Sequence, residues 1–187
     1  MVNLTSILFV LALTSVAFPL ALGLHPDKEN RQGNLFLIAL LFGAVQAMMV
    51  FLGNLLGQQF MHLFSAHHQI VVFAVFGLIA VRMIIEALKI RKENRLFAFE
   101  SYSRLLIIAI AAAINSLIAG MVGKYFQPFG TALPWAFFIA GFGWSILGLL
   151  LPINRINILL ASVLQLFFAV VLLIIGLLYL FKLLVIS

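Results

Sequence analysis

The stretch from Leu105 to Gly123, LLIIAIAAAINSLIAGMVG, decides the fold. It contains no charged residue over a length that can cross a bilayer, so it predicts a transmembrane helix. Its middle carries one strongly polar side chain, Asn115, which Ser116 follows. Because an unpaired amide in hydrocarbon costs several kcal/mol, we expect Asn115 to face other helices or water. Small residues at helical spacing would let neighbouring backbones approach this helix closely: Ala109, Ala112, Ser116, Ala119 and Gly123.

The composition extends this interpretation to the whole chain. Of its 187 residues, 65% are hydrophobic and 9% are charged, whereas soluble domains are roughly 45–50% apolar and about 25% charged. The chain is therefore predicted to be an all-α polytopic membrane protein with a single membrane domain, residues 1–187, whose partner is the lipid bilayer. The net charge of +6 is explained by cations between the spans, so no nucleic-acid partner is expected. The absence of cysteine excludes thiolate metal sites.

Hydropathy predicts six transmembrane helices, at about 4–24, 34–57, 70–88, 105–123, 133–151 and 158–181. The first apolar run has no basic segment before it, so it is interpreted as a span and not as a cleaved signal peptide. Pro134 suits the first turn of the fifth span, and Pro152 closes that span. The longest charged linker covers residues 89–104.

The distribution of cations predicts the orientation. With the 89–104 linker in the cytoplasm, eight cations fall on the cytoplasmic side: Lys28, Arg31, Lys89, Arg91, Lys92, Arg95, Arg104 and Arg155. Only Lys124 and Lys182 fall on the other side. This positive-inside bias places both termini outside the cytoplasm.

Three spans precede the basic linker and three follow it, so matching halves, residues 1–88 and 105–187, would be inverted relative to each other. Residues 14–18 (TSVAF) can be laid over residues 113–117 (AINSL), and the second and fifth spans are both rich in glycine. We therefore predict two inverted three-helix repeats. Such repeats place substrate sites near the bilayer midplane.

Gln46 lies near the middle of the second span, on a polar face of small residues, at the depth of Asn115. The two amides could form a hydrogen bond that joins the second and fourth spans, or they could line a transport path together with Ser116. Neutral amides bind a dehydrated divalent cation less well than carboxylates do. Gln165 in the sixth span is expected to contribute to helix packing.

Pro19 interrupts the first span. Proline has no amide hydrogen, so the carbonyl of Ser15 loses its helical partner and is expected to be a free acceptor beside Thr14 and Ser15. This feature could be an ordinary kink satisfied by a neighbouring helix, or part of an ion or substrate site.

Arg82 and Glu86 are four residues apart in the third span, so they can form an ion pair on one helix face. The pair could be an interfacial anchor, with Arg82 extending toward the headgroups, or a cytoplasmic gate that opens when the pair breaks. His62, His67 and His68 are expected in a surface loop, where capture of a metal ion is an alternative role. No catalytic constellation is visible, so neither an enzyme nor a cofactor is predicted.

Three segments resemble landmarks of the bacterial manganese efflux pump (MntP) family, which belongs with the lysine-exporter superfamily of six-span transporters: Phe42-Gly43-Ala44-Val45-Gln46, Arg82-Met83-Ile84-Ile85-Glu86 and Ala109–Ser116. The resemblance covers nearly the whole chain. It implies a small transporter in the bacterial cytoplasmic membrane that exports Mn²⁺ or another small solute. The oligomeric state is not predicted.

The chain departs from the family at the acidic residues that the resemblance assigns to the metal. The family carries carboxylates inside the membrane where this chain has Val16, Asn34, Gln46 and Asn115. Loss of these charges weakens the attraction for a dication and removes groups that could couple transport to protons. The chain could therefore transport a different solute, such as an amino acid, or be a non-transporting scaffold or regulatory relative.

Overall fold

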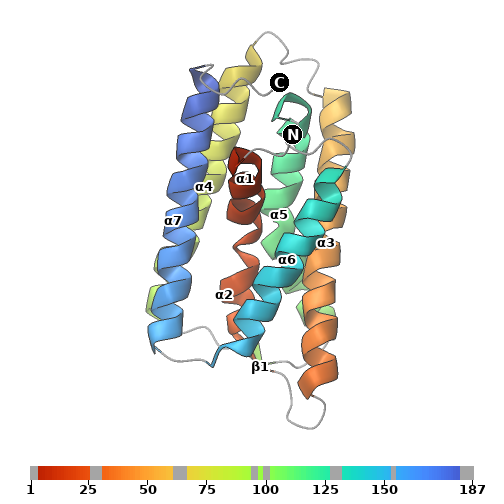
Figure 1. Ribbon diagram of the computed structural model, residues 1–187, viewed down its shortest axis with the longest axis vertical. Helices are drawn as coiled ribbons and strands as arrows, with labels where there is room; N and C mark the ends of the chain where they lie inside the picture. The colour runs from red at the N-terminus through yellow and green to blue at the C-terminus, as the bar shows by residue number, and fades with distance from the viewer. Residues whose placement is uncertain are drawn as a thin grey trace.

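The computed structural model describes residues 4–25, 31–60, 67–93, 97–98, 102–126, 132–152 and 155–181. These residues form a bundle of α-helices that run along one common direction (Figure 1). Six stretches are long and apolar enough to cross a membrane: Leu4–Leu22, Leu35–Gln59, His68–Lys89, Leu105–Gly123, Leu133–Leu150 and Ile156–Leu180. The predicted all-α fold with six candidate membrane spans is therefore confirmed.

The first candidate span consists of two helices, α1 (Leu4–Thr14) and α2 (Ala17–Leu22), and the others are single helices. Their bounds are α3 (Arg31–Phe60), α4 (His68–Glu93), α5 (Tyr102–Phe126), α6 (Leu133–Leu150) and α7 (Arg155–Leu180). Helices α3 and α4 extend beyond the predicted limits, so the first residues of the predicted 89–104 linker are helical. Hydropathy marks only the part inside hydrocarbon, whereas lysine, arginine and glutamine continue a helix readily past its boundary.

A short strand pair is the one non-helical element that the described residues contain. Strand β1 (Leu24–His25) pairs in parallel with β2 (Phe97–Ala98), with Leu24 opposite Phe97. The sequence did not predict this pair, because two residues are too few to show the alternation typical of a strand. It joins the end of the first span to the linker between the two halves of the chain.

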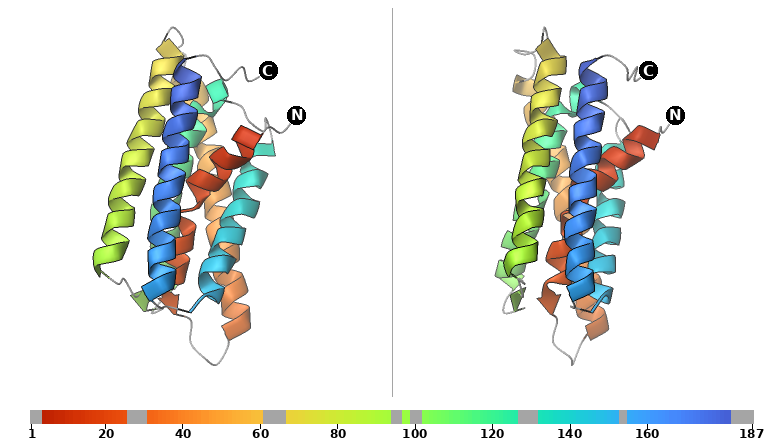
Figure 2. Two further views of the ribbon diagram at one scale, coloured as in Figure 1. Left: turned by 60° about the vertical axis from the view of Figure 1, so that its left-hand side comes forward. Right: turned by 90° about the vertical axis from the view of Figure 1, so that its left-hand side faces the viewer.

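The helices form two groups. Helix α3 packs against α5 and α6, and α2 packs against α6, whereas α4 packs mainly against α7. Helices α1 and α2 lie between these groups, and α1 leans away from the direction of α2 (Figures 1 and 2). Phe9 of α1 connects the groups, because its ring lies 5.3 Å from that of Phe76 on α4 and 6.4 Å from that of Phe137 on α6.

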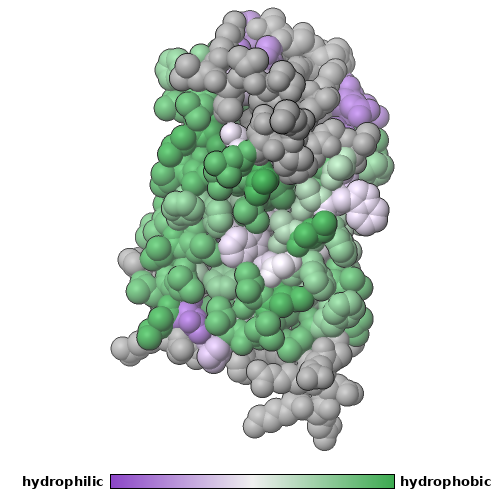
Figure 3. Space-filling model, viewed as in Figure 1, coloured by the Kyte–Doolittle hydropathy of each residue, from purple (hydrophilic) through white to green (hydrophobic). Residues whose placement is uncertain are grey.

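The face of the bundle drawn in Figure 3 is mostly apolar over its described residues. Large side chains point outward from several helices, for example Leu78, Ile107, Ile139 and Leu150. In a soluble protein so much exposed apolar surface would cause association. Around six membrane-length helices it is the surface that contacts lipid.

Glycines bring specific backbones together inside the bundle. A β-carbon added to Gly53 on α3 would overlap the carbonyl oxygen of Leu117 on α5, and one added to Gly148 on α6 would lie 2.5 Å from the carbonyl oxygen of Phe18 on α2. Only glycine permits such approaches, because any side chain would force the helices apart. These contacts set the positions of α3, α5, α2 and α6 around the interior.

Candidate functional site

The predicted polar residues of the second and fourth spans are buried at one helix contact. Gln46 on α3 and Ser116 on α5 are both 0% exposed, and the Ser116 hydroxyl donates a hydrogen bond to the side-chain carbonyl of Gln46. Gly141 on α6 gives the Gln46 side chain its space, since a β-carbon there would lie 2.9 Å from Gln46 Cγ. The alternative of a direct hydrogen bond between Gln46 and Asn115 is wrong: Ser116 is the partner of Gln46.

Asn115 is also 0% exposed, in agreement with its predicted orientation away from lipid. Within the described part of the chain, three side-chain atoms of the two buried amides have no hydrogen-bond partner: Gln46 Nε2, Asn115 Nδ2 and Asn115 Oδ1. Buried polar atoms are almost always paired, so an exception requires a specific explanation. We call Gln46, Asn115 and Ser116 the polar seam.

The break in the first span has its own hydrogen bonds. The Thr14 hydroxyl donates to the Val10 carbonyl at 2.8 Å, and the Ser15 hydroxyl donates to the Ala12 carbonyl at 2.7 Å. The expectation of a free Ser15 carbonyl is wrong, because this oxygen accepts the Phe18 amide at 3.0 Å. The backbone tightens into a three-residue turn before Pro19, and this turn replaces the helical bond that proline cannot donate.

Trp144 on α6 holds this break in position. Its indole Nε1 donates to the Leu11 carbonyl in α1 at 3.2 Å. Its ring also makes edge contacts with Phe18 on α2, at 6.0 Å, and with Phe168 on α7, at 5.6 Å. One side chain therefore contacts both halves of the broken span. Sequence alone gives Trp144 no distinct role, because a tryptophan in an apolar helix carries no specific signature.

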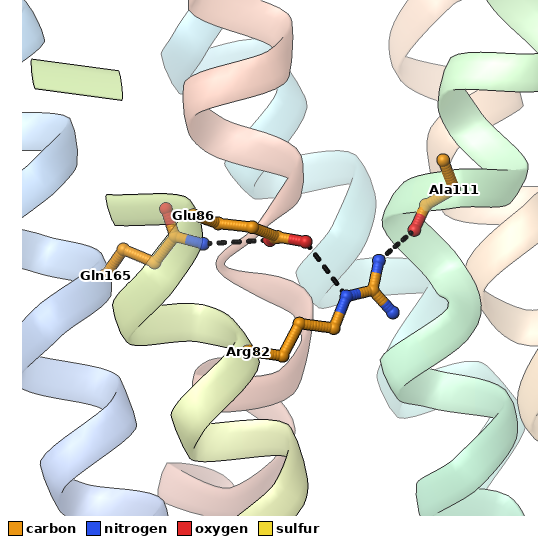
Figure 4. A network of polar contacts seen from close by, with 4 residues as sticks. All are labelled: Arg82, Glu86, Ala111 and Gln165. Carbon is orange, nitrogen blue, oxygen red and sulfur yellow. Dashed lines mark hydrogen bonds and ion pairs between the residues drawn. The ribbon is translucent and has the colours of Figure 1, made fainter. Parts of the chain in front are cut away.

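A network of polar contacts joins three helices, α4, α5 and α7 (Figure 4). On α4, Arg82 Nε lies 2.9 Å from Glu86 Oε1, so the ion pair expected from the spacing is formed. Arg82 Nη2 donates to the Ala111 carbonyl on α5 at 3.1 Å, and Gln165 Nε2 on α7 donates to Glu86 Oε2 at 3.3 Å. The pair thus connects α4 to α5 and α7. Contacts of this kind between distant helices have no signature in the sequence.

Helix α7 contributes two further polar groups. The Ser162 hydroxyl donates to the Ala87 carbonyl on α4 at 2.9 Å, and this bond supports the packing of the two helices. Gln165 is 1% exposed, and its Oε1 has no partner within the described residues. Gln165 was expected only to aid packing, but it also donates a hydrogen bond to the Glu86 carboxylate on α4.

Other predicted residues lie apart from the seam or outside the described structure. The side chain of Asn34 and the whole of His62 are outside it, His67 is exposed, and His68 lies beside the ring of Tyr179. Val16 is buried. In the parts of the chain that the structure describes, no three His, Cys, Asp or Glu side chains come together as a metal site.

Comparison with known proteins identifies related sequences. The model of a family described as "Putative manganese efflux pump" matches residues 29–180. Two curated relatives from Wolinella succinogenes carry the same description. MntP 2 is 33% identical over 65% of this chain and 66% of its own length, and MntP 1 is 36% identical over 62% of this chain and 63% of its own length. A relative from Fusobacterium nucleatum is 28% identical over 65% of this chain and 67% of its own length. No solved structure matches the chain.

Proposed function

Because the chain belongs to the manganese efflux pump (MntP) family, we propose that it is a small secondary transporter that exports a cation or another small solute through the polar seam. The matched relatives are covered over about two thirds of their length. The names of these relatives concern manganese. Which solute this chain carries is a matter of proposal. An enzymatic role has no support in this family.

The buried, unpartnered amide atoms of Gln46 and Asn115 carry this proposal. Each such atom costs several kcal/mol in a membrane interior if nothing binds it. A seam that opens to water or to a polar solute removes this cost during transport. Hydrogen-bonding side chains placed inside a bundle of membrane helices mark solute pathways for this reason.

The broken first span supports a path beside the seam. Discontinuous helices commonly border transport sites, because their breaks allow one part of a span to move relative to the other. In this role Thr14, Ser15 and the turn before Pro19 form the flexible side of the path, and Trp144 holds that side closed through the Leu11 carbonyl. Asn34, the other predicted residue of the path, stays a sequence-based expectation.

We also propose that the two halves are inverted repeats. Under the sequence overlay, Phe18 corresponds to Leu117, and these two carbonyls are the ones approached by Gly148 and Gly53 respectively. In one contact the glycine belongs to the second half and the carbonyl to the first half, and in the other contact the two are reversed. Both termini lie at one end of the bundle (Figure 1). We place that end outside the cytoplasm of a bacterial inner membrane, with the basic linker on the cytoplasmic side.

A second candidate function is a non-transporting membrane scaffold or regulatory partner. The observation that favours it is the lack of carboxylates in the seam: Gln46, Asn115 and Ser116 are neutral, and Val16 is apolar. Without titrating or metal-binding groups, the bundle could retain its shape after losing transport. The experiment below separates the two functions.

The test is a flux assay in proteoliposomes that carry the full chain, with Mn²⁺, other metal ions and amino acids supplied in parallel. We expect at least one solute to cross with the wild type. Asn115→Leu and Gln46→Leu should each lower that flux about tenfold or more, because they remove the hydrogen bonds that the solute needs. Gln58→Leu makes the same change at an exposed site on α3 and should keep the flux. Flux that survives both seam substitutions would contradict the proposal, and absence of flux for every solute would favour the scaffold.

A further inference from the structure

Gln46 has one unmet hydrogen-bonding requirement. Its side-chain oxygen accepts the hydroxyl of Ser116, whereas its amide nitrogen, Nε2, has no acceptor among the described residues. The residue is fully buried and lies near the middle of the candidate span Leu35–Gln59. A primary amide nitrogen carries two hydrogens and acts only as a donor. What Gln46 lacks is therefore an acceptor, and a second donor cannot take that place.

The Ser116 hydroxyl decides which end of the Gln46 amide stays free. An unconstrained amide can turn over and offer either its oxygen or its nitrogen, but the bond from Ser116 holds the oxygen. The position of Ser116 is itself fixed, because the carbonyl of the next residue, Leu117, lies where a β-carbon on Gly53 would stand. The close approach of α3 and α5 thus places the hydroxyl at the Gln46 oxygen.

Helix α6 holds the stem of the same side chain. A β-carbon added to Gly141 would lie 2.9 Å from Gln46 Cγ and 3.3 Å from Gln46 Cβ, so an alanine there would displace the side chain. The Gly141 carbonyl does not supply the missing acceptor, because it already accepts the Ser145 hydroxyl at 2.8 Å. Gln46 is therefore held at its oxygen by α5 and at its stem by α6, and its nitrogen is left to bind something else.

We propose that Ser116 and Gly141 are positioning residues that fix Gln46 as a hydrogen-bond donor, so that the polar seam recognises its solute through an acceptor oxygen. This inference rests on the proposed function, since it concerns what the path through the seam admits. The solute class is small molecules that present a carbonyl or carboxylate oxygen. A bare metal ion is outside this class, because it has no lone pair to accept the hydrogens of Gln46. Asn115 does not narrow the class, since an amide with both atoms unpartnered can donate or accept.

The test measures flux in proteoliposomes that carry the full chain, with two kinds of probe. One is a panel of radiolabelled amino acids, carboxylic acids and amides, and the other is Mn²⁺. We expect the wild type to carry a member of the panel. Gln46→Glu keeps an oxygen for Ser116 but replaces the NH₂ group with a second oxygen, which only accepts once the carboxyl group is ionised at alkaline pH. The KM of the transported solute should then rise about tenfold or more. Gln58→Glu, the same change at an exposed site of α3, should leave it unaltered.

Two further variants test the contacts that hold Gln46. Gly141→Ala changes no polar group but displaces the Gln46 stem, and Ser116→Ala frees the Gln46 oxygen so that the amide can turn over. Each should raise the KM, because the solute loses a placed donor, whereas loss of folded protein lowers only the maximal rate. Gly143→Ala should keep the wild-type KM, since no atom beyond the adjacent backbone of its own helix lies within 4 Å of the added carbon.

Two results would overturn the inference and leave the transporter intact. One is a wild type that carries Mn²⁺ but no member of the panel, and the other is a Gln46→Glu variant with the KM of the wild type. Should Gln46→Glu fail to fold, equal KM values for Gly141→Ala and Gly143→Ala would overturn it as well. A wild type that carries neither the panel nor Mn²⁺ refutes the transporter, and the inference falls with it.

Discussion

Ser116 on α5 donates a hydrogen bond to the side-chain carbonyl of Gln46 on α3, and this bond leaves the amide nitrogen of Gln46 without a partner among the described residues. Asn115, the neighbour of Ser116, has neither of its amide atoms bonded there. Among the described residues, this side-chain bond links α3 to α5, while the amide nitrogen of Gln46 and both amide atoms of Asn115 stay unbonded. A site that is held in place and yet has free hydrogen-bonding groups suits recognition of a polar solute.

Ser116→Ala should weaken the contact between α3 and α5. The substitution removes the donor and leaves the Gln46 carbonyl unpaired, so the free energy of unfolding should fall by about 1 kcal/mol, within the range measured for hydrogen bonds in membranes. The measurement is equilibrium unfolding in mixed micelles. Ser145→Ala removes a hydroxyl that bonds only to its own helix, at Gly141, and should cost less. Equal losses in the two variants would show that the bond between helices contributes little.

Gly53→Ala should disturb the same helix pair through sterics. The added methyl group would overlap the Leu117 carbonyl, so α3 and α5 must separate, and we expect a loss of about 2 kcal/mol or more, as found for overpacking of a close contact. Gly77→Ala is the control, because no atom beyond the adjacent backbone of its own helix lies within 4 Å of the added carbon. Alanine favours a helix over glycine, so this variant should be as stable as the wild type or slightly more stable. Thermal unfolding of both variants checks the expectation, and a stable Gly53→Ala protein would contradict the close approach.

Trp144→Phe should loosen the break in the first span. Phenylalanine keeps an aromatic ring beside Phe18 and Phe168 but cannot donate to the Leu11 carbonyl. We expect a loss of about 1 kcal/mol, the usual net value of one hydrogen bond. Faster hydrogen exchange should appear around residues 15–18. Trp135→Phe changes an exposed tryptophan and should leave exchange there unaltered.

Much of the fold followed from residue type and spacing. Runs of apolar residues predicted the six spans, because hydrocarbon thickness fixes the length of a membrane helix. The four-residue spacing of Arg82 and Glu86 predicted their pairing, and the energetic cost of an exposed amide predicted the burial of Asn115. Each of these inferences depends either on the spacing of residues along one helix or on the free energy of moving a side chain from water into hydrocarbon. Both can be read from the residue types and their order.

The features that the sequence did not reveal arise between distant segments. The choice of Ser116 over Asn115 as the partner of Gln46 depends on how α3 and α5 are rotated against each other. The bonds from Arg82 to Ala111 and from Trp144 to Leu11 join helices whose relative positions no spacing rule gives. The Ser15 carbonyl found a partner because the backbone changed to a tighter turn, an adjustment that the ideal helix used in the prediction does not include.

Water access to Asn115 is the most direct test of the central claim that its buried amide lines a wettable path. The chain contains no cysteine, so single-cysteine variants can be labelled at one place. Thiols react as thiolates, which require water, so Asn115→Cys in membrane vesicles should react with a water-soluble methanethiosulfonate reagent about tenfold faster than two control variants. The controls are Ala169→Cys, which is sealed inside the bundle, and Ile107→Cys, which faces lipid. A reaction at position 115 as slow as that at position 169 would contradict the account.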